Sequence, residues 1–470
     1  MTRNTTAGQG SNSPNTRLEI ARALTQIIGH GRTIDWVRAE RPQWLQSPLH
    51  SELLYGTLRH YLSLTALLQR QLKRPLKARD LDLQHLLLVG AYQLKYTAVA
   101  DYAAISECVD ACKGLGKPWA KGLINGVLRA LQRERKTEPE PDALATSDHP
   151  EWLRSLLQRQ YGEQAVTLMK ANNRRAPMTL RINQIAIHPD TFKQGLHAAN
   201  IPFAEGPWPE AVTLLEPQIA ANLPGWDRGE CAVQDQAAQY AAHLITDAVL
   251  SKGPNASPIK VLDACAAPGG KLFHLRETLT QAGIEHHLFA LDNKAPRLQE
   301  LSAIATRLGH STHPHADGSP LNTQSIGLIC ADGCASDLPF PEKLDIILID
   351  APCSGSGTIR RNPDIRLLLT EEALMAQQIL QRQLLQNLWQ RLVPGGTLVY
   401  STCSVFSEEN DQVIQSFLGN TADACVVIPS LASGSPTQYG WQLLPTEPQT
   451  DGFYYCVLEK STDLNRASTP

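Results

Sequence analysis

The sequence has no long apolar run. No segment approaches the roughly 20 uninterrupted apolar residues that a membrane-spanning helix needs. Residues 1–16 are rich in Asn, Thr, Gly and Ser and contain no apolar core, so they do not resemble a secretory signal. We therefore expect a cytoplasmic protein that does not enter membranes and that begins with a disordered tail at residues 1–16.

Cysteine is sparse and irregularly spaced. Ten cysteines are distributed over 470 residues, which is typical of reduced thiols in a cytoplasmic protein. Cys108 and Cys112 are separated by three residues, as are Cys330 and Cys334, but no histidine or second cysteine pair follows at zinc-finger spacing. We predict no metal site from the sequence.

Neither sign of charge dominates the whole chain, because the formal net charge is −3. The distribution is uneven: residues 1–140 contain 20 Lys and Arg and 12 Asp and Glu, a net of +8, whereas the remainder has a net of −11. A basic first third indicates a polyanionic partner, although a solvated helical surface carries similar charge without one. A chain of 470 residues is too long to fold around a single hydrophobic core, so we expect two or three soluble domains.

Residues 18–131 show the periodicity of helices. Apolar residues recur every three or four positions, for example in 86–94, which predicts an all-α bundle at residues 17–135. A charged, Pro-rich stretch predicts a linker at 136–148. Residues 149–227 combine helical and short strand patterns, which indicates a small α+β region.

From residue 260 onward, strand patterns alternate with helical ones. This alternation predicts a doubly wound parallel sheet in a catalytic domain at residues 228–460, followed by a tail at 461–470. The first strand pattern leads into a turn of small residues and a helix start. Small residues let a ligand approach the backbone, and the amides of a helix start can face its polar end. The turn comprises Cys265, Ala266, Ala267, Pro268, Gly269, Gly270 and Lys271.

The next strand pattern, 287–292, ends in Asp292, which lies about 20 residues beyond the small-residue turn. At this offset a carboxylate accepts hydrogen bonds from ribose hydroxyls. The turn does not have the G-x-G-x-x-G pattern that binds a pyrophosphate. A ligand with a ribose but no phosphate therefore fits better, and S-adenosylmethionine is such a ligand.

Two further strand patterns end near a cysteine. Residues 344–350 are apolar and deliver Asp350 and Cys353 to their carboxyl end, where ligands bind to open parallel sheets. After a Pro-Gly-Gly turn, residues 397–402 lead into Cys403. A thiol at such a position can act as a nucleophile once it is deprotonated, and a neighbouring acid can bond a substrate or move a proton. For either strand alone, the simpler interpretation is a core strand with an inert cysteine.

The helical part resembles the NusB-like RNA-binding domain that is fused to bacterial rRNA methyltransferases. The resemblance implies that the basic bundle contacts RNA. It rests on the order and spacing of Tyr55-Gly56-Thr57-Leu58-Arg59, Val89-Gly90-Ala91-Tyr92-Gln93-Leu94 and Lys121-Gly122-Leu123-Ile124-Asn125-Gly126-Val127-Leu128-Arg129.

The second half is similar to the RNA cytosine-5 methyltransferases in its small-residue turn, its Asp-Ala-Pro-Cys and Thr-Cys-Ser stretches and its closing strand at 451–458. The resemblance implies a Rossmann-like class I S-adenosylmethionine-dependent methyltransferase domain with an antiparallel last strand. DNA enzymes use the Pro-Cys cysteine as nucleophile, whereas the RNA enzymes use the Thr-Cys cysteine. By this resemblance Cys403 is the nucleophile, Cys353 is the release catalyst, and Asp350 bonds the pyrimidine and also borders the cofactor.

The same resemblance places the cofactor. Residues 265–271 surround its methionine end, Asp292 holds the ribose, and a later acid contacts the adenine side. Asp317 and Asp332 each begin an Asp-Gly pair. We assign Asp332, which follows an apolar run, and we treat residues 311–325 as an insertion relative to the family.

Several charged residues near these motifs have two interpretations each. Lys271 either contributes positive charge beside the cofactor or substrate, or is an exposed lysine in a first helical turn. Arg360 and Arg361 either grip phosphates beside an unpaired base or form a salt bridge with Asp364. Arg181 either contacts RNA phosphate or belongs to an ordinary polar surface.

The two resemblances together point to the B type of the bacterial 16S rRNA cytosine-C5 methyltransferases. They imply a monomeric enzyme that acts on 16S rRNA, free or in a small-subunit assembly intermediate. The alternatives are a methyltransferase for another RNA such as tRNA, and a non-catalytic RNA-binding or assembly protein with a vestigial fold. Retention of both cysteines, Asp350 and the cofactor turn favours an enzyme. A thiol redox enzyme lacks the expected C-x-x-C spacing.

Overall fold

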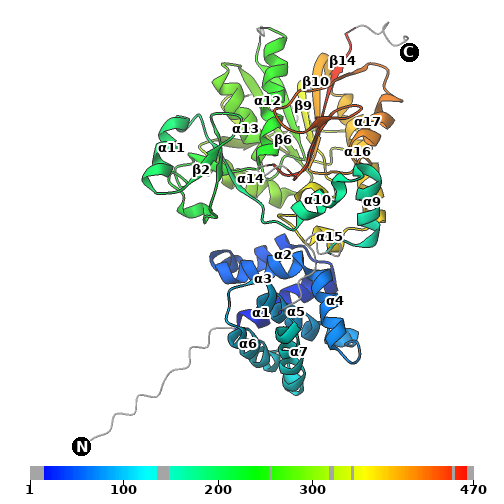
Figure 1. The fold of residues 1–470 in the computed structure, drawn as a ribbon. Helices are drawn as coiled ribbons and strands as arrows, with labels where there is room; N and C mark the ends of the chain where they lie inside the picture. Colours follow the sequence, from blue (N-terminus) through cyan, green and yellow to red (C-terminus); the bar gives the residue numbers. More distant parts are fainter. Residues whose placement is uncertain are drawn as a thin grey trace, which may run out of the picture. The chain divides into compact units, whose positions relative to one another are not determined.

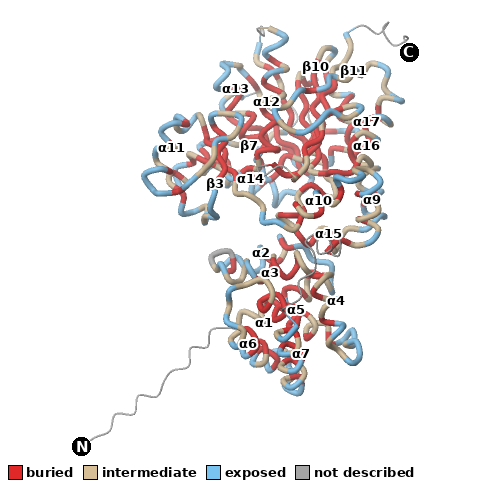
Figure 2. The backbone as a smooth tube through the Cα atoms, viewed as in Figure 1, coloured by how far each residue is buried: buried red, intermediate tan, exposed pale blue. Residues whose placement is uncertain are grey.

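The chain separates into two compact units in the computed structural model (Figure 1). The first comprises Met1–Leu156 with Asn362–Leu368, and the second comprises Leu157–Arg361 with Leu369–Pro470. Each unit has its own buried core, drawn in red in Figure 2. The structure describes residues 15–134, 148–253, 257–316, 322–339, 343–446 and 450–462.

Three predicted segments lie largely outside the described residues. They are the tail at 1–16, the linker at 136–148 and the tail at 461–470. In the ranges that are described, no helix is both long and apolar enough to cross a membrane.

The first unit is a bundle around helix α5 (Leu81–Tyr96), which is buried almost all round. Side-chain oxygens of Asn15, Thr33 and Ser47 accept amide hydrogens from the first turns of three helices and so define where these helices begin. The elements around α5 are α1 (Thr16–Leu24), η1 (Thr25–Gly29), α2 (Ile34–Glu40), η2 (Pro42–Gln46), α3 (Pro48–Arg59), α4 (Tyr61–Gln71), η3 (Ala78–Asp80), α6 (Asp101–Gly114), η4 (Pro118–Ala120) and α7 (Lys121–Glu134).

A short segment from much later in the sequence belongs to this bundle. The segment Asn362–Leu368 contains α15 (Ile365–Leu368), whose leucines pack against the bundle core. Asp364 Oδ2 accepts the amide hydrogen of Ile34 at 2.9 Å, and the buried Arg366 donates to a backbone carbonyl of the bundle at 3.3 Å. The chain therefore leaves the second unit after residue 361 and returns at residue 369.

The second unit contains a small sheet with the order β2-β3-β1-β4, in which all paired strands are antiparallel. This sheet confirms the predicted small α+β region. Its fourth strand lies beyond residue 227, because residues 231–233 pair with β1. Helix α9 (Glu151–Tyr161) crosses the boundary between the two units after Leu156. The other elements are α10 (Gln164–Asn172), β1 (Met178–Ile182), α11 (Pro189–Ala198), β2 (Phe203–Glu205), β3 (Ala211–Leu214), η5 (Ala220–Asn222) and β4 (Cys231–Val233).

The large sheet has the order β12-β13-β14-β10-β9-β5-β6-β8-β7, with β11 also paired to β14. Strands from β10 to β7 are parallel, and β14 pairs antiparallel with β10. The predicted doubly wound sheet with an antiparallel last strand is confirmed. The strands are β5 (Ile259–Ala264), β6 (His286–Asp292), β7 (Ser311–Pro314), β8 (Ser325–Cys330), β9 (Leu344–Asp350), β10 (Leu392–Thr402), β11 (Ala424–Val427), β12 (Ser435–Pro436), β13 (Trp441–Leu443) and β14 (Phe453–Lys460).

Helices cover both faces of this sheet (Figure 1). Strand β9 lies between β5 and β10, and its side chains alternate between the two cores, with Leu348 facing one and Ile347 the other. Burial on both faces explains its nearly continuous apolar sequence. One face packs against α12 (Gln236–Ser251), α13 (Gly270–Gln281) and α14 (Ala295–Arg307), and the other packs against α16 (Glu371–Trp389) and α17 (Asp411–Leu418).

Candidate active site at the carboxyl edge of the large sheet

Five parallel strands end at one edge of the large sheet. The order β10-β9-β5-β6-β8 places the loops that follow these strands side by side. Open parallel sheets bind their ligands at this edge. Every predicted site residue lies at the end of one of these strands or in the loop that follows it, so the strand order brings them to one region.

The small-residue turn after β5 has two residues with positive φ, Cys265 at 64° and Gly269 at 103°. A side chain at Gly269 would place its Cβ 2.4 Å from the ring of Phe273, so this position requires glycine. Helix α13 begins at Gly270, and the amide hydrogens of a first helical turn have no partner within the helix. The turn therefore offers open backbone and unpaired amides to a ligand.

Asp263, the penultimate residue of β5, did not stand out in the sequence. Its side chain is fully buried, and neither carboxyl oxygen has a hydrogen-bond partner in the described part of the chain. Burial raises its pKa well above the ordinary value, and Asp350 adds to this effect although Lys271 opposes it. A buried carboxyl is costly without a partner, so it marks a place for a hydrogen-bond donor of a ligand. The only signal in the sequence is an acid within an apolar strand.

Asp292 and Asp332 lie at neighbouring strand ends. The amide of Lys294 donates to Asp292 Oδ1 at 3.1 Å, and Arg297 Nη1 lies 3.0 Å from Oδ2. Strand β8 pairs with β6 so that Cys330 is opposite Asp292, which places Asp332 two residues past this point. The assumed insertion at 311–325 begins with an edge strand of the sheet, β7, and Asp317 lies outside the described residues.

Cys353 and Cys403 meet although 50 positions separate them in the sequence. Their Sγ atoms are 3.4 Å apart, because Asp350 and Ser401 are opposite each other on β9 and β10 and the cysteines follow shortly after. The hydrogen bond to Cys403 and then burial raise the pKa of Cys353 well above the ordinary value. One sulfur therefore donates a hydrogen bond to the other, and the raised pKa favours Cys353 as the thiol that keeps its proton.

Lys271 reaches from the cofactor turn to Asp350. Its Nζ lies 2.7 Å from Asp350 Oδ2, and Ser401 Oγ donates to the other oxygen at 3.3 Å. Only 9% of the Lys271 side chain is exposed, so it is not a solvated lysine. Burial lowers the pKa of Lys271, but the charge and hydrogen bond of Asp350 together with Cys403 outweigh burial and raise it. An ammonium group therefore lies beside Asp350 and Cys403.

The loop after Cys353 is held by Glu409, a buried acid that nothing in the sequence distinguishes from a surface acid. Ser354 donates to it through its amide at 2.7 Å and through its hydroxyl at 2.5 Å. The amide of Gly357 donates to the carbonyl of Cys403 at 3.0 Å. A Cβ at Gly357 would lie 2.1 Å from the carbonyl oxygen of Gly452, so this close approach requires glycine. The two cysteine loops thus form one fixed unit.

Arg360 and Arg361 have structural partners. Arg360 is buried and donates to Asp451 Oδ1 at 2.7 Å, and Arg361 donates to Asp235 Oδ2 at 2.6 Å and also contacts Asp451. These partners differ from Asp364, the alternative partner that the sequence offered, and burial keeps Arg360 from RNA phosphates. These arginines join the loop after Cys353 to the starts of α12 and β14.

Arg181 of β1 is also buried, so both interpretations of it as a surface residue are wrong. Its Nη1 donates to the carbonyl of Gly270 at 2.6 Å and to Gln234 at 2.5 Å, and its Nη2 donates to Glu277 at 2.8 Å. Arg181 therefore ties the small sheet to the first residue of α13, within the cofactor turn. Arginines on the surface and in the core look alike in a single sequence.

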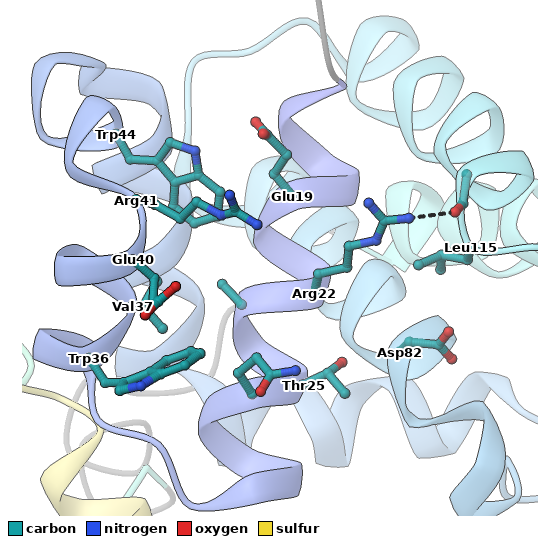
Figure 3. Close-up of a pocket in the computed structure, with 13 residues that line it drawn as sticks. Glu19, Arg22, Thr25, Trp36, Val37, Glu40, Arg41, Trp44, Asp82 and Leu115 are labelled. Atoms are coloured by element: carbon teal, nitrogen blue, oxygen red, sulfur yellow. Dashed lines mark hydrogen bonds between the residues drawn. The ribbon is translucent and has the colours of Figure 1, made fainter.

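A pocket of about 560 Å³ lies elsewhere, in the helical unit, where α1 and α2 line it (Figure 3). Its walls mix Glu19 and Glu40 with Arg22 and Arg41, and Arg22 already donates to the carbonyl of Gly114 at 2.8 Å. The lining therefore offers no single charge to a polyanion, and no predicted site residue takes part in it.

A doubly wound sheet with an antiparallel last strand and a small-residue turn after its first strand defines a class I methyltransferase fold. Family models match along the chain: the NusB family at residues 14–133, the ferredoxin-like domain of RsmF/B-like methyltransferases at 149–220, and the 16S rRNA methyltransferase RsmB/F at 250–459.

Relatives match almost the whole chain. It is 36% identical to the ribosomal RNA small subunit methyltransferase B of Pseudomonas syringae pv. tomato, with 96% of this chain and 98% of the relative covered. It is 35% identical to the same enzyme of Vibrio vulnificus, with 95% and 99% covered. A crystal structure of a methyltransferase homologue from Pyrococcus horikoshii aligns over 69% of this chain and 100% of its own, with a TM-score of 0.55 and 26% identity. The chain therefore belongs to the 16S rRNA methyltransferase RsmB/F family, which confirms the resemblance noted in the sequence.

Proposed function

We propose that this chain transfers a methyl group from S-adenosylmethionine to C5 of one cytosine in 16S rRNA, through a covalent bond between Cys403 and C6 of the base. The observation that carries the proposal is the pair of thiols 3.4 Å apart, next to the Lys271–Asp350 ion pair. Membership of an rRNA methyltransferase family supports the substrate class. The basic helical unit is the part of the chain suited to hold the RNA.

The residues at the sheet edge fit the cofactor. The unpartnered carboxyl of Asp263 would accept hydrogen bonds from its amino group, and the turn at 265–271 would surround its methionine end. Asp292 would hold the ribose, and Asp332 would contact the adenine side. When bound, the cofactor supplies an electrophilic methyl group on a positively charged sulfur.

The thiolate is the reactive form of a cysteine. Cys403 lies beside the Lys271 ammonium, which would attract negative charge on the sulfur, and its Sγ is 3.4 Å from that of Cys353. Attack of the thiolate on C6 moves an electron pair toward C5 while Asp350 bonds the base at N3. C5 then has the nucleophilic character that methyl transfer requires.

Cys353 is placed to complete the reaction. Its hydrogen bond to Cys403 is the largest cause of its raised pKa, and that bond is lost once the sulfur of Cys403 is joined to C6. Cys353 then ionises more readily, its own proton passes to solvent, and the resulting thiolate takes the C5 proton. The electron pair of the C5–H bond forms the C5–C6 double bond, the C6–S bond breaks, and the Cys403 thiolate is restored.

The two cysteine roles separate in one experiment. Purified variants are incubated with an unmodified 16S rRNA fragment and cofactor, and covalent complexes are resolved on a denaturing gel. Cys403→Ala is expected to give neither adduct nor 5-methylcytosine, because no sulfur bonds C6. Cys353→Ala is expected to accumulate the adduct, because release is blocked.

Cys330→Ala provides the matched control, since Cys330 is an exposed cysteine at another strand end. This variant should behave as the wild type. If Cys353→Ala gave no adduct and Cys403→Ala accumulated it, the assignment of the two cysteine roles would be wrong. If wild-type protein formed no 5-methylcytosine on free 16S rRNA or on small-subunit particles, the proposed function itself would be rejected.

A further inference from the structure

Three potential metal ligands converge where the small sheet packs against the helices of the large one. Glu210 directly precedes β3, His243 belongs to α12, and His274 belongs to α13. Glu210 Oε1 lies 2.8 Å from His243 Nε2 and 3.3 Å from His274 Nε2, and the three ligand atoms all lie within 4.8 Å of one another. His243 and His274 lie 33 and 64 positions after Glu210 in the sequence, so the three residues do not form a short sequence motif.

The charge of this cluster is not balanced by its immediate partners. Glu210 is only 2% exposed, and in the described part of the chain no Lys or Arg nitrogen lies within ion-pair distance of it. His274 is 1% exposed, so two of the three ligand side chains are removed from water. A buried acid without a Lys or Arg partner leaves a place for a bound cation as its counter-charge.

We propose that Glu210, His243 and His274 bind one divalent transition-metal ion, for which zinc is the best match. Zinc takes imidazole nitrogens and carboxylate oxygens at about 2.0–2.2 Å, and the observed separations of the ligand atoms allow an ion between them after a small adjustment. Magnesium and calcium prefer oxygen-only sets and fit two imidazoles poorly.

The surroundings orient the ligands. The ring of Trp208 stacks on His243 with centroids 4.0 Å apart and planes within 9°, which restricts rotation of the imidazole. A metal here joins the edge of the small sheet to α12 and α13, and α13 begins at the cofactor turn. The ion therefore stabilises the junction of two subdomains, and its binding does not depend on the proposed methylation.

Cobalt(II) is a suitable probe because its visible bands report the ligand type. The full-length protein is freed of metal with a chelator and titrated with cobalt. We expect about one equivalent to bind with d–d bands and without thiolate-to-cobalt charge transfer, since the site contains no sulfur. Glu210→Gln and His243→Gln should each weaken binding at least about tenfold. His188→Gln, at an exposed histidine before α11, should leave binding unchanged.

Thermal unfolding of the wild-type protein provides a second test, which requires no variant. Zinc should raise the thermal midpoint of the wild-type protein, and a chelator should reverse this rise. Absence of sulfur-free cobalt bands in the wild type would overturn the proposal and leave the three residues as a hydrogen-bonded cluster. A thiolate charge-transfer band would also overturn it, because the metal would then be bound by cysteines such as Cys353 and Cys403.

Discussion

The cofactor end and the cysteine end of the same sheet edge differ in how their buried polar groups are paired. At the cofactor end, neither oxygen of Asp263 has a partner among the described residues. At the cysteine end, Asp350 is bonded by Lys271 and Ser401, and Glu409 is bonded by Ser354. The cysteine end is thus preorganised by the protein alone, whereas the cofactor end becomes complete only with a ligand.

This difference has an energetic meaning. An unpartnered buried polar group costs about 1–3 kcal/mol, and more when it is charged. A fixed arrangement of nucleophile and acid needs no reorganisation during the reaction. Under the proposed function, the cost at Asp263 lies where a bound cofactor would relieve it, and the hydrogen bonds to Glu409 hold the loop that carries Cys353. The following predictions are ordered by the size of the expected effect.

Arg181→Met tests whether the cofactor end depends on support from the small sheet. The substitution leaves Glu277 buried without its partner, so we expect a loss of about 3–5 kcal/mol in the free energy of unfolding. Denaturant titration measures this loss. Arg175→Met, at an exposed arginine of the same region, should change stability by less than about 0.5 kcal/mol. Equal effects of the two substitutions would contradict a supporting role.

Asp263→Asn tests the unpartnered carboxyl directly. We expect S-adenosylhomocysteine, the product form of the cofactor, to bind about 100-fold more weakly by calorimetry, which corresponds to loss of one charged hydrogen bond.

The wild type and the Asp263→Asn variant should differ in how their stability depends on pH. Because burial raises the folded pKa of Asp263, the unfolded chain releases this proton first as pH increases above the ordinary pKa of 3.8. The wild type therefore loses stability as pH rises from about 4 toward neutrality, and the variant escapes this loss. Denaturant titration of both proteins at about pH 5 and about pH 8 measures their free energies of unfolding. The stability of the variant relative to the wild type should increase with pH, and a decrease would contradict the raised pKa of Asp263.

Glu409→Gln makes the corresponding change at the cysteine end, where the carboxyl is paired. Here we expect destabilisation by about 1–2 kcal/mol, because the two bonds from Ser354 are weakened. The methylation rate should fall, since the loop that carries Cys353 becomes less ordered. If Glu409→Gln were instead more stable than the wild type, the pairing of Glu409 would not stabilise the protein, and the difference from Asp263 would disappear.

Lys271→Met tests the connection between the ends. Without the ammonium group, Asp350 and the sulfur of Cys403 lose a positive neighbour, so the methylation rate should fall about tenfold. Single-turnover methylation measures this loss. Lys294→Met, at a lysine near Asp292 rather than the cysteines, should leave the rate unchanged.

Periodicity explains why the architecture was accessible from sequence. The apolar strand that ends at Asp350 predicts a buried parallel strand, and the structure places it between β5 and β10 as β9. The burial and the pairing of individual side chains were harder to predict from the sequence. Lys271, Arg181 and Arg360 each had a solvent-exposed interpretation, yet all three are buried and paired with acids that lie far away in the sequence.

The sequence by itself determined the helical bundle, the alternating strands and helices, and the presence of two cysteines after adjacent strand patterns. These features follow from local periodicity and from residue types at strand ends. Only the tertiary structure decided that the sulfurs of Cys353 and Cys403 are 3.4 Å apart, that Lys271 pairs with Asp350, and that Asp263 has no partner among the described residues. The physical reason is that pairing and burial depend on which distant strands become neighbours, and hydrophobic patterning does not specify this.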